Sequence, residues 1–301
     1  MPRSIPAIFL LAVAAGLFPA AARAQSIAFV HESTIYEAVV GPLKAPEGVA
    51  CTERGALVVG DTGNRRVLLF NVKEGRVTGG EEIKLPQLSA PIRLQIDSKG
   101  NVLALDGKTH QVVRIAANGT FGGTVQAAGA ANRSSVVVGA FKLDARDNVY
   151  LLDVAGRRVL LLDSSGTLAS EIPLPKETQA VTDIAVDAAG NLFALDAVGG
   201  TIWIAEKTAT AFRSLASKLK DKMSFPTYLT TGRGRLFVVD RHGNGVAIFG
   251  ADGSYMGRQL SVGAMNGLVN YPGQLCLTGD GAAYLADTLN NRVQVFSTGA
   301  K

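Results

Sequence analysis

The stretch Gly55-Ala-Leu-Val-Val-Gly-Asp61 decides the fold, because the chain carries five further versions of it. Each version has a turn residue, a run of apolar residues and a closing aspartate. The others are Gly100-Asn-Val-Leu-Ala-Leu-Asp106, Asp147-Asn-Val-Tyr-Leu-Leu-Asp153, Gly190-Asn-Leu-Phe-Ala-Leu-Asp196, Gly234-Arg-Leu-Phe-Val-Val-Asp240 and Gly281-Ala-Ala-Tyr-Leu-Ala-Asp287. The closing aspartates recur every 43 to 47 residues, which indicates one structural unit used six times.

Each unit has the pattern of four strands separated by turn residues. An apolar run such as Ile184-Ala-Val186 precedes the repeated string, and a run such as Val67-Leu-Leu-Phe70 follows it after a polar loop. A weaker fourth run comes after a glycine turn, as in Gly166-Thr-Leu-Ala-Ser-Glu-Ile172. Strand-length runs with no long helical period predict an all-β protein. Four strands in a unit of about 45 residues are typical of a propeller blade, so we predict a six-bladed β-propeller.

The two ends of the repeat array predict how the ring closes. The last unit stops after its third strand at Val293-Gln-Val-Phe296, while residues 33–40 hold strand-like residues ahead of the first full unit. We predict that this N-terminal strand becomes the fourth strand of the last blade. Closure of this kind removes the open sheet edges that a linear array would expose.

The N-terminus has the features of a secretory signal peptide. Arg3 gives a positive start, Ile8 to Phe18 form a short apolar run, and Ala22-Arg23-Ala24 is an A-x-A cleavage site. The run is shorter than the roughly twenty residues that span a bilayer. We expect cleavage after Ala24, one propeller domain over 25–301, no membrane span, and a monomer located in the periplasm or secreted.

Charge and cysteine content narrow the class of partner. The formal net charge is +5, and two of the positive charges, Arg3 and Arg23, lie in the expected signal peptide. A mildly basic exported protein favours acidic partners, and export argues against cellular nucleic acid. With only two cysteines, a hydrophobic core rather than a disulfide framework must hold the fold.

Two segments resemble NHL repeats, a family named for an Asn-His-Leu pattern. They are Pro46-Glu-Gly-Val-Ala-Cys-Thr-Glu-Arg-Gly-Ala-Leu-Val-Val-Gly-Asp-Thr-Gly-Asn-Arg-Arg-Val-Leu-Leu-Phe70 and Asn270-Tyr-Pro-Gly with Ala286-Asp-Thr-Leu-Asn-Asn-Arg-Val-Gln-Val-Phe296. Units four and five depart from the pattern, with Gly200-Thr201 and Asn244-Gly245 where the family usually has a basic residue. The resemblance implies a six-bladed propeller used mostly for binding, although a few relatives are enzymes.

Three of the repeated aspartates have an arginine five residues later. A tight loop would bring Asp61, Asp153 and Asp287 within ion-pair distance of Arg66, Arg158 and Arg292, respectively. Because a catalytic site is normally built once, a feature that recurs in several blades indicates that these pairs fix loops.

The loops that follow these aspartates should share one face with the connections between blades. On that face we expect a basic ligand-binding surface formed by Arg65, Arg66, Lys108, His110, Arg157, Arg158, Arg241, His242 and Arg292. The leading hypothesis is an exported, non-catalytic binding or scaffold propeller that holds an acidic protein, peptide or polysaccharide around the central channel, without catalytic residues, metal or cofactor.

The alternative is a metal-dependent lyase or lactonase-like enzyme, with calcium or zinc in the channel. Glu47 and Asp183 lie near the start of first strands, but Arg93, Thr227 and Gln274 occupy the aligned positions, which makes a poor cation cage. Of the three histidines, His31 is N-terminal and the other two fall in separate loops, so a three-histidine zinc site is not evident.

Cys51 and Cys276 fall in the first strands of units one and six, which become neighbours when the ring closes. Their registers differ by one residue, so they lie on opposite faces of their sheets, and opposite faces of adjacent blades can meet. A disulfide across the seam and two separate buried thiols are both compatible with this placement.

Overall fold

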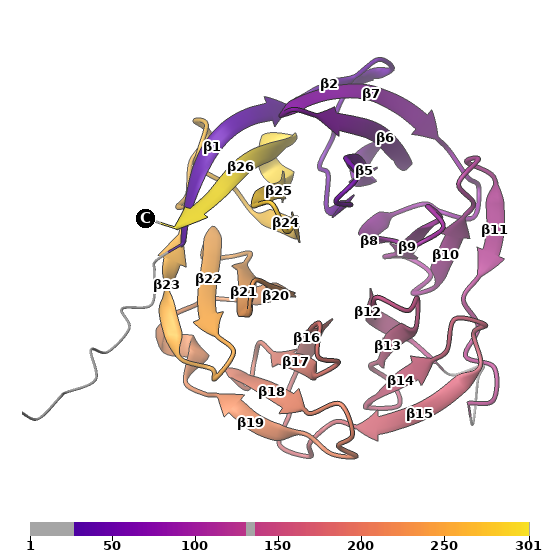
Figure 1. The fold of residues 1–301 in the computed structure, drawn as a ribbon, viewed down its shortest axis with the longest axis vertical. Coiled ribbons are helices and arrows are strands. Elements are labelled where there is room, and N and C mark those ends of the chain that lie inside the picture. Colours follow the sequence, from indigo (N-terminus) through magenta and orange to yellow (C-terminus); the bar gives the residue numbers. More distant parts are fainter. Residues whose placement is uncertain (1–26, 131–135, 301) are drawn as a thin grey trace, which may run out of the picture.

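The computed structural model describes residues 27–130 and 136–300, and the expected signal peptide at 1–24 lies outside this range. The described chain forms six four-stranded antiparallel sheets arranged around a central axis (Figure 1). The predicted all-β, six-bladed propeller is therefore confirmed.

Every blade has the same order of strands from the axis outward. The inner strands are β4 (Gly48–Cys51), β8 (Pro91–Ile96), β12 (Val138–Leu143), β16 (Val181–Val186), β20 (Pro226–Gly232) and β24 (Pro272–Leu277). The second strands, which carry the repeated string, are β5 (Ala56–Asp61), β9 (Val102–Asp106), β13 (Val149–Asp153), β17 (Leu192–Asp196), β21 (Arg235–Asp240) and β25 (Ala282–Asp287).

The third strands are β6 (Arg66–Lys73), β10 (Val112–Ile115), β14 (Arg158–Leu162), β18 (Thr201–Ala205), β22 (Gly245–Gly250) and β26 (Arg292–Ala300). The outer strands are β7 (Arg76–Ile83), β11 (Phe121–Thr124), β15 (Leu168–Pro173), β19 (Arg213–Ala216), β23 (Tyr255–Gln259) and β1 (Ile27–Ile35).

The last blade is completed by β1, which pairs with β26 along its length from Ile27 opposite Ala300 to Ile35 opposite Val293. The predicted closure by an N-terminal strand is confirmed, but the predicted bounds of 33–40 are wrong. Phe29 explains the earlier start, because its ring packs edge-on against Phe237 and Phe296 and anchors this part of β1. Beyond β1, the chain instead forms a small hairpin of β2 (Glu37–Ala38) and β3 (Gly41–Pro42).

The hydrophobic core is divided into six clusters, one between each pair of neighbouring blades. The second strands lie between neighbours on both faces, which explains why their side chains are buried without alternation. The seam between blades 6 and 1 has its own cluster, in which Val293 and Tyr284 pack with Val49 and Leu57. The ring is therefore continuous in its packing at the point where the chain ends meet.

Strand direction separates the two ends of the propeller. Because the strands of a blade alternate in direction, the loop after each second strand and each connection between blades lie at the same end. We call this end the aspartate face, after the six aspartates that close the second strands. Within residues 27–130 and 136–300, no helix has the length and apolar character needed to cross a membrane.

Candidate functional site

All six closing aspartates are buried and bind backbone N–H groups of the preceding interblade connection. Lys44 N donates to Asp61 Oδ1 at 2.7 Å, and Asn270 N donates to Asp287 Oδ1 at 2.7 Å. In blade 4, Asp196 accepts from two successive N–H groups, both at 2.9 Å. Each aspartate thus ties a loop of its blade to the connection that enters the blade, which is a structural task repeated around the ring.

Arginine completes this arrangement in four blades. The Nε atoms of Arg66, Arg158 and Arg292 lie 2.7, 3.1 and 2.6 Å from the carboxylates of their partner aspartates, respectively. In blade 5, the loop has no such arginine, and Arg258 of β23 reaches Asp240 at 2.9 Å.

Asp106 has no arginine partner and relies on backbone donors. Burial of its carboxyl acts to raise the pKa, but the N–H groups of Ser89, Lys108, Thr109 and Ala90 outweigh that effect. The pKa of Asp106 therefore lies below its ordinary value, and the carboxylate stays ionised in the folded protein.

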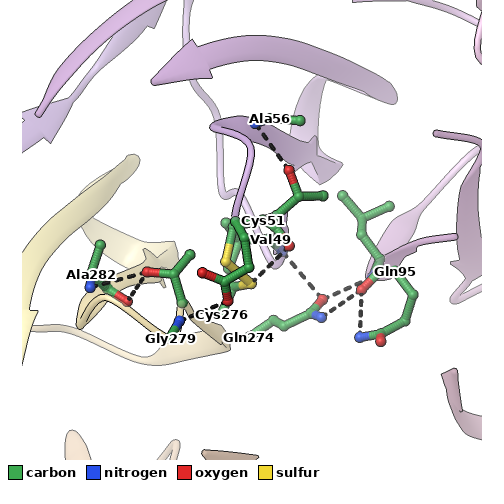
Figure 2. Close-up of a disulfide and its surroundings, with 12 residues drawn as sticks. Val49, Cys51, Ala56, Gln95, Gln274, Cys276, Gly279 and Ala282 are labelled. Carbon is green, nitrogen blue, oxygen red and sulfur yellow. Dashed lines mark hydrogen bonds between the residues drawn. A yellow bond between two sulfur atoms is a disulfide. The ribbon is translucent and has the colours of Figure 1, made fainter. Parts of the chain in front are cut away.

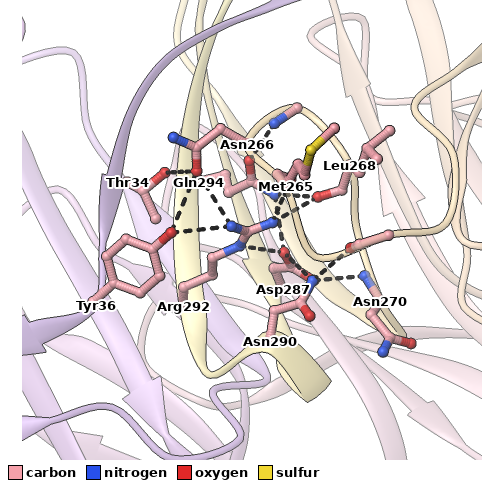
Figure 3. A network of polar contacts seen from close by, with 12 residues as sticks. Thr34, Tyr36, Met265, Asn266, Leu268, Asn270, Asp287, Asn290, Arg292 and Gln294 are labelled. Carbon is pink, nitrogen blue, oxygen red and sulfur yellow. Dashed lines mark hydrogen bonds and ion pairs between the residues drawn. The ribbon is translucent and has the colours of Figure 1, made fainter.

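Arg292 is the centre of the most extensive network of this kind (Figure 3). Besides Asp287, its guanidinium donates to the carbonyl oxygens of Met265 and Leu268, both at 2.8 Å. It also donates to Tyr36 Oη at 3.1 Å and Asn266 Oδ1 at 3.2 Å. One buried side chain thus joins the chain that follows β1 to the connection between blades 5 and 6.

The predicted basic ligand surface is only partly present. Arg65, Lys108, His110, Arg157 and His242 are exposed on the aspartate face. Arg66 and Arg292 are buried in their ion pairs, and Arg158 is mostly covered between Asp153 and Glu171. Their inclusion in a ligand surface is therefore wrong, because the aspartates hold these guanidinium groups inward.

Cys51 and Cys276 form a disulfide between β4 and β24 (Figure 2). Their Cα atoms are 5.9 Å apart and the bond links positions separated by 225 residues. The disulfide therefore braces the inner strands at the same seam that β1 closes at the outer edge.

The inner strands present unpaired backbone edges to the axis, and side chains from other blades satisfy them. Gln274 accepts from Val49 N and Leu94 N at 3.2 and 2.8 Å, and its amide donates to Leu94 O at 2.7 Å. Asp183 Oδ2 accepts from Leu229 N at 2.7 Å. These bonds cap strand edges that would otherwise carry buried, unsatisfied polar groups.

Further into the ring, Tyr228 lies between two cations. Lys142 Nζ is 3.7 Å from the centre of the Tyr228 ring, and the Arg93 guanidinium is 5.3 Å from it. Lys142 also forms an ion pair with Asp183 Oδ2 at 3.2 Å. A polar plug therefore occupies the axis, held by cation–π contacts and one buried ion pair.

Four buried polar atoms near the start of β20 have no hydrogen-bond partner among the described residues. They are Arg93 Nε, Asp183 Oδ1, Thr227 Oγ1 and Arg241 Nε. Hydrogen bonds link these residues to β20 or to the residue before it: Arg93 donates to Thr227 O at 2.9 Å, Asp183 accepts from Leu229 N, and Arg241 N donates to Phe225 O. Two guanidinium donors, one carboxylate oxygen and one hydroxyl near the start of β20 are thus buried without partners, which needs an explanation in a native fold.

The rim above this group is aromatic and charged. Arg241 forms an ion pair with Glu47 at 2.9 Å and lies 4.3 Å from the centre of the Tyr271 ring. His242 stacks between Phe225 and Tyr271, with ring centres 5.0 and 5.4 Å away. We call the partnerless group and this rim, which together comprise Glu47, Arg93, Asp183, Phe225, Thr227, Arg241, His242 and Tyr271, the channel-mouth site.

The channel-mouth site does not suit a metal cation. Glu47 and Asp183, its two carboxylates, are each already in an ion pair, with Arg241 and Lys142. Across the described ranges, no three histidine, cysteine, aspartate or glutamate side chains are grouped as metal ligands. The donor set is thus dominated by guanidinium groups, which repel a cation.

The comparisons with known proteins identify the fold. No protein-family model and no curated protein sequence matches the chain. A streptogramin B lyase matches with 14% identity and a TM-score of 0.64, over 91% of this chain and 97% of that one. A candidate gluconolactonase matches with 13% identity and a TM-score of 0.65, over 91% and 93%, respectively. The PQQ-bound aldose sugar dehydrogenase from Streptomyces coelicolor matches with 14% identity and a TM-score of 0.63, over 91% and 99%.

These matches define the chain as a six-bladed propeller and correct the leading functional hypothesis. The expectation of a non-catalytic binding or scaffold propeller is contradicted by a lyase, a candidate lactonase and a dehydrogenase, each of which shares this fold over about nine-tenths of the chain. At this identity the likeness itself establishes the fold alone.

Proposed function

We propose that the protein is an enzyme that opens a cyclic ester, by hydrolysis or by elimination, at the channel-mouth site. The observation that carries the proposal is the presence of four buried, partnerless polar atoms on residues that contact the start of β20. The lyase and candidate lactonase that share the fold support this class of reaction.

The residues suit an ester carbonyl. Hydrolysis places negative charge on the ester carbonyl oxygen in a tetrahedral intermediate. Elimination removes a proton on the alcohol side of the ester, next to a second carbonyl, and the charge develops on the oxygen of that second carbonyl. Arg93 Nε and Arg241 Nε have no partner among the described residues and would donate to that charge, and donors held in place before the reaction are the usual source of such stabilisation.

Asp183 suits the role of general base. Its Oδ2 is occupied by Lys142 and Leu229 N, which fix the carboxylate, while Oδ1 remains without a partner. In hydrolysis Oδ1 would take a proton from the attacking water, and in elimination it would take the proton next to the second carbonyl, from the carbon adjacent to the one that bears the ester oxygen. The Thr227 hydroxyl would donate a hydrogen bond to the ring oxygen that leaves. In hydrolysis that oxygen would take the proton back from Asp183 and leave as an alcohol, and in elimination it would leave as part of a carboxylate. No step requires a metal, for which the donor set is unsuited.

Two threonines provide a matched test. Thr227 and Thr182 are the second residues of β20 and β16, but the Thr182 hydroxyl donates to Pro226 O at 3.1 Å, whereas the Thr227 hydroxyl has no partner. Initial rates would be measured on a panel of γ- and δ-lactones and on quinupristin. We expect Thr227→Val to lower kcat/KM roughly three- to tenfold without loss of stability, and Thr182→Val to cost about 1 kcal/mol of stability with kcat/KM nearly unchanged.

Asp183→Asn provides the stronger variant, with a rate loss of about a hundredfold or more if the carboxylate is the base. A folded wild-type protein with no turnover of any substrate in the panel would contradict the proposal. Equal losses of kcat/KM for the two threonine variants would also contradict it, because the partnerless Thr227 hydroxyl would then contribute no more to the reaction than the hydrogen-bonded Thr182 hydroxyl.

The assignment to NHL repeats and the exported location are also proposals. The strings at 46–70 and 270–296 support the first, and an alignment of related chains that lacked the basic residue at positions 66, 158 and 292 would contradict it. The leader-like residues 1–24 support export. Sequencing of the N-terminus from native cells should begin at Gln25, and a start at Pro2 would contradict export.

A further inference from the structure

The aspartate face carries a large excess of exposed positive charge. Its loops and interblade connections contain nine exposed lysines and arginines: Lys44, Arg65, Lys84, Lys108, Arg157, Lys176, Lys218, Lys220 and Lys222. The exposed carboxylates in the same described segments are three: Glu37, Glu177 and Asp221. The whole chain has a formal charge of only +5, so positive charge is concentrated at this end of the propeller.

The same face also carries most of the exposed apolar side chains. Eight of the eleven large apolar residues that are exposed in the described chain lie in these segments: Tyr36, Val39, Val40, Val154, Val198, Val262, Met265 and Leu289. The most exposed are Val39 at 88%, in the turn between β2 and β3, and Met265 at 72%, between blades 5 and 6. The remaining three, Val30, Phe121 and Tyr255, lie on outer strands.

We propose that the aspartate face docks on an anionic lipid surface, with Val39, Val40 and Met265 entering the headgroup layer. Positive charge alone would suit any polyanion, and exposed apolar side chains alone would suit a protein partner. Their combination at one end of the molecule, with apolar tips among lysines, is the arrangement that peripheral membrane binding requires.

This inference does not rest on the proposed reaction. It concerns the periphery of the aspartate face, whereas the channel-mouth site lies at its centre. Docking would turn the channel mouth toward the lipid, so an amphipathic substrate would reach it from the headgroup layer.

Co-sedimentation with vesicles tests the inference on the full mature protein. Vesicles of phosphatidylcholine alone would be compared with vesicles that also contain phosphatidylglycerol, at low and high salt. We expect binding to the anionic vesicles only, and weaker binding at high salt because surface charges are screened.

Two variants separate the apolar and charged contributions. Val39→Ser combined with Val40→Ser should weaken binding about tenfold, since two apolar side chains no longer enter the lipid. Lys218→Glu, Lys220→Glu and Lys222→Glu together should weaken it at least tenfold, because each basic residue near an anionic membrane adds to the electrostatic attraction.

Matched controls lie off the face. Phe121→Ser removes an exposed aromatic ring from β11, and Lys99→Glu with Arg146→Glu reverses two exposed charges on the opposite end. These controls should leave vesicle binding within twofold of wild type. Thermal unfolding would show that every variant is folded.

Several results would overturn the inference. They are absence of binding to anionic vesicles, equal binding to neutral vesicles, and equal losses for the face variants and the controls. Binding to soluble heparin that is as tight as binding to vesicles and insensitive to the valine variant would instead assign the face to a soluble polyanion.

Discussion

Removal of the Arg292 side chain should destabilise the propeller more than removal of any matched exposed arginine. Arg292→Met deletes five hydrogen bonds, to Asp287, Tyr36, Asn266 and the carbonyl oxygens of residues 265 and 268, while keeping much of the apolar stem. It also leaves the fully buried carboxylate of Asp287 without its cation. Breaking a buried pair in this way typically costs about 3–5 kcal/mol.

The structure places the expected loss at the lower end of that range. Asp287 retains hydrogen bonds from Asn270 N, from the Asn290 amide and from Gln294 Nε2, so its charge is still partly satisfied. The Leu268 carbonyl also keeps a bond from Gln294 at 2.7 Å. We therefore expect a loss of about 3 kcal/mol in the free energy of unfolding.

Urea unfolding monitored by circular dichroism would measure this loss. The matched variant Arg158→Met breaks the equivalent pair in blade 3, where the arginine is more exposed and a second partner, Glu171, lies half in solvent. It should cost about 1–2 kcal/mol. In the double variant, Asp287→Asn should recover part of the loss caused by Arg292→Met. A loss below about 1 kcal/mol for Arg292→Met, or equal losses in the two blades, would refute the reasoning.

Three further predictions concern stability. Cys51→Ser with Cys276→Ser should lower the free energy of unfolding by about 2–4 kcal/mol, measured by urea denaturation without reductant, and an unchanged midpoint would contradict a bracing role at the seam. Because the pKa of Asp106 is lower in the folded protein, its carboxylate contributes stability above its unfolded pKa of about 3.9, and that stability is lost as the pH falls through the lower folded value. Asp106→Asn should therefore flatten the decline in melting temperature that the wild type shows below about pH 5. Parallel curves of melting temperature against pH for the two proteins would contradict this prediction. Gly60→Ala should cost about 1–3 kcal/mol by urea unfolding, because a Cβ would lie 2.5 Å from Pro91 O of the next blade, and a neutral effect would show that the blades can separate at no cost.

The fold could be predicted from the sequence because the same sequence pattern occurs once in every blade. Six versions of one string fix the number of blades, and the aspartate of each string must be buried and bonded in the same way. For the closing strand, the sequence predicted that an N-terminal strand completes the last blade but not where that strand begins and ends. Its bounds depend on Phe29 packing against Phe237 and Phe296, more than two hundred residues away, and such contacts leave no local signal.

The candidate site was harder to predict for the opposite reason. Arg93 and Asp183 occupy equivalent places near the start of two inner strands, with Thr227 one residue earlier on a third, yet the residue types differ from blade to blade. A search for repeats detects positions that carry the same residue type in every blade, so it does not detect positions such as these. The sequence did place these three residues at the channel and did indicate that they form a poor cation cage, but only the folded ring reveals which of their polar atoms lack partners.

The paired arginines show the same limit. The spacing of five residues correctly brings Arg66 and Arg292 to their aspartates. It does not reveal that the guanidinium groups turn inward and leave the surface, because that depends on carbonyl oxygens supplied by connections between blades, such as those of residues 265 and 268.

A crystal structure of the protein soaked with an unreactive lactam analogue of a cyclic ester would test the channel-mouth site most directly. We predict that the amide carbonyl oxygen of the analogue lies within hydrogen-bond distance of Arg93 Nε or Arg241 Nε, with Asp183 Oδ1 facing the ring. Ordered waters that satisfy all four polar atoms, with the analogue absent from the channel mouth at saturating concentration, would contradict the proposed site.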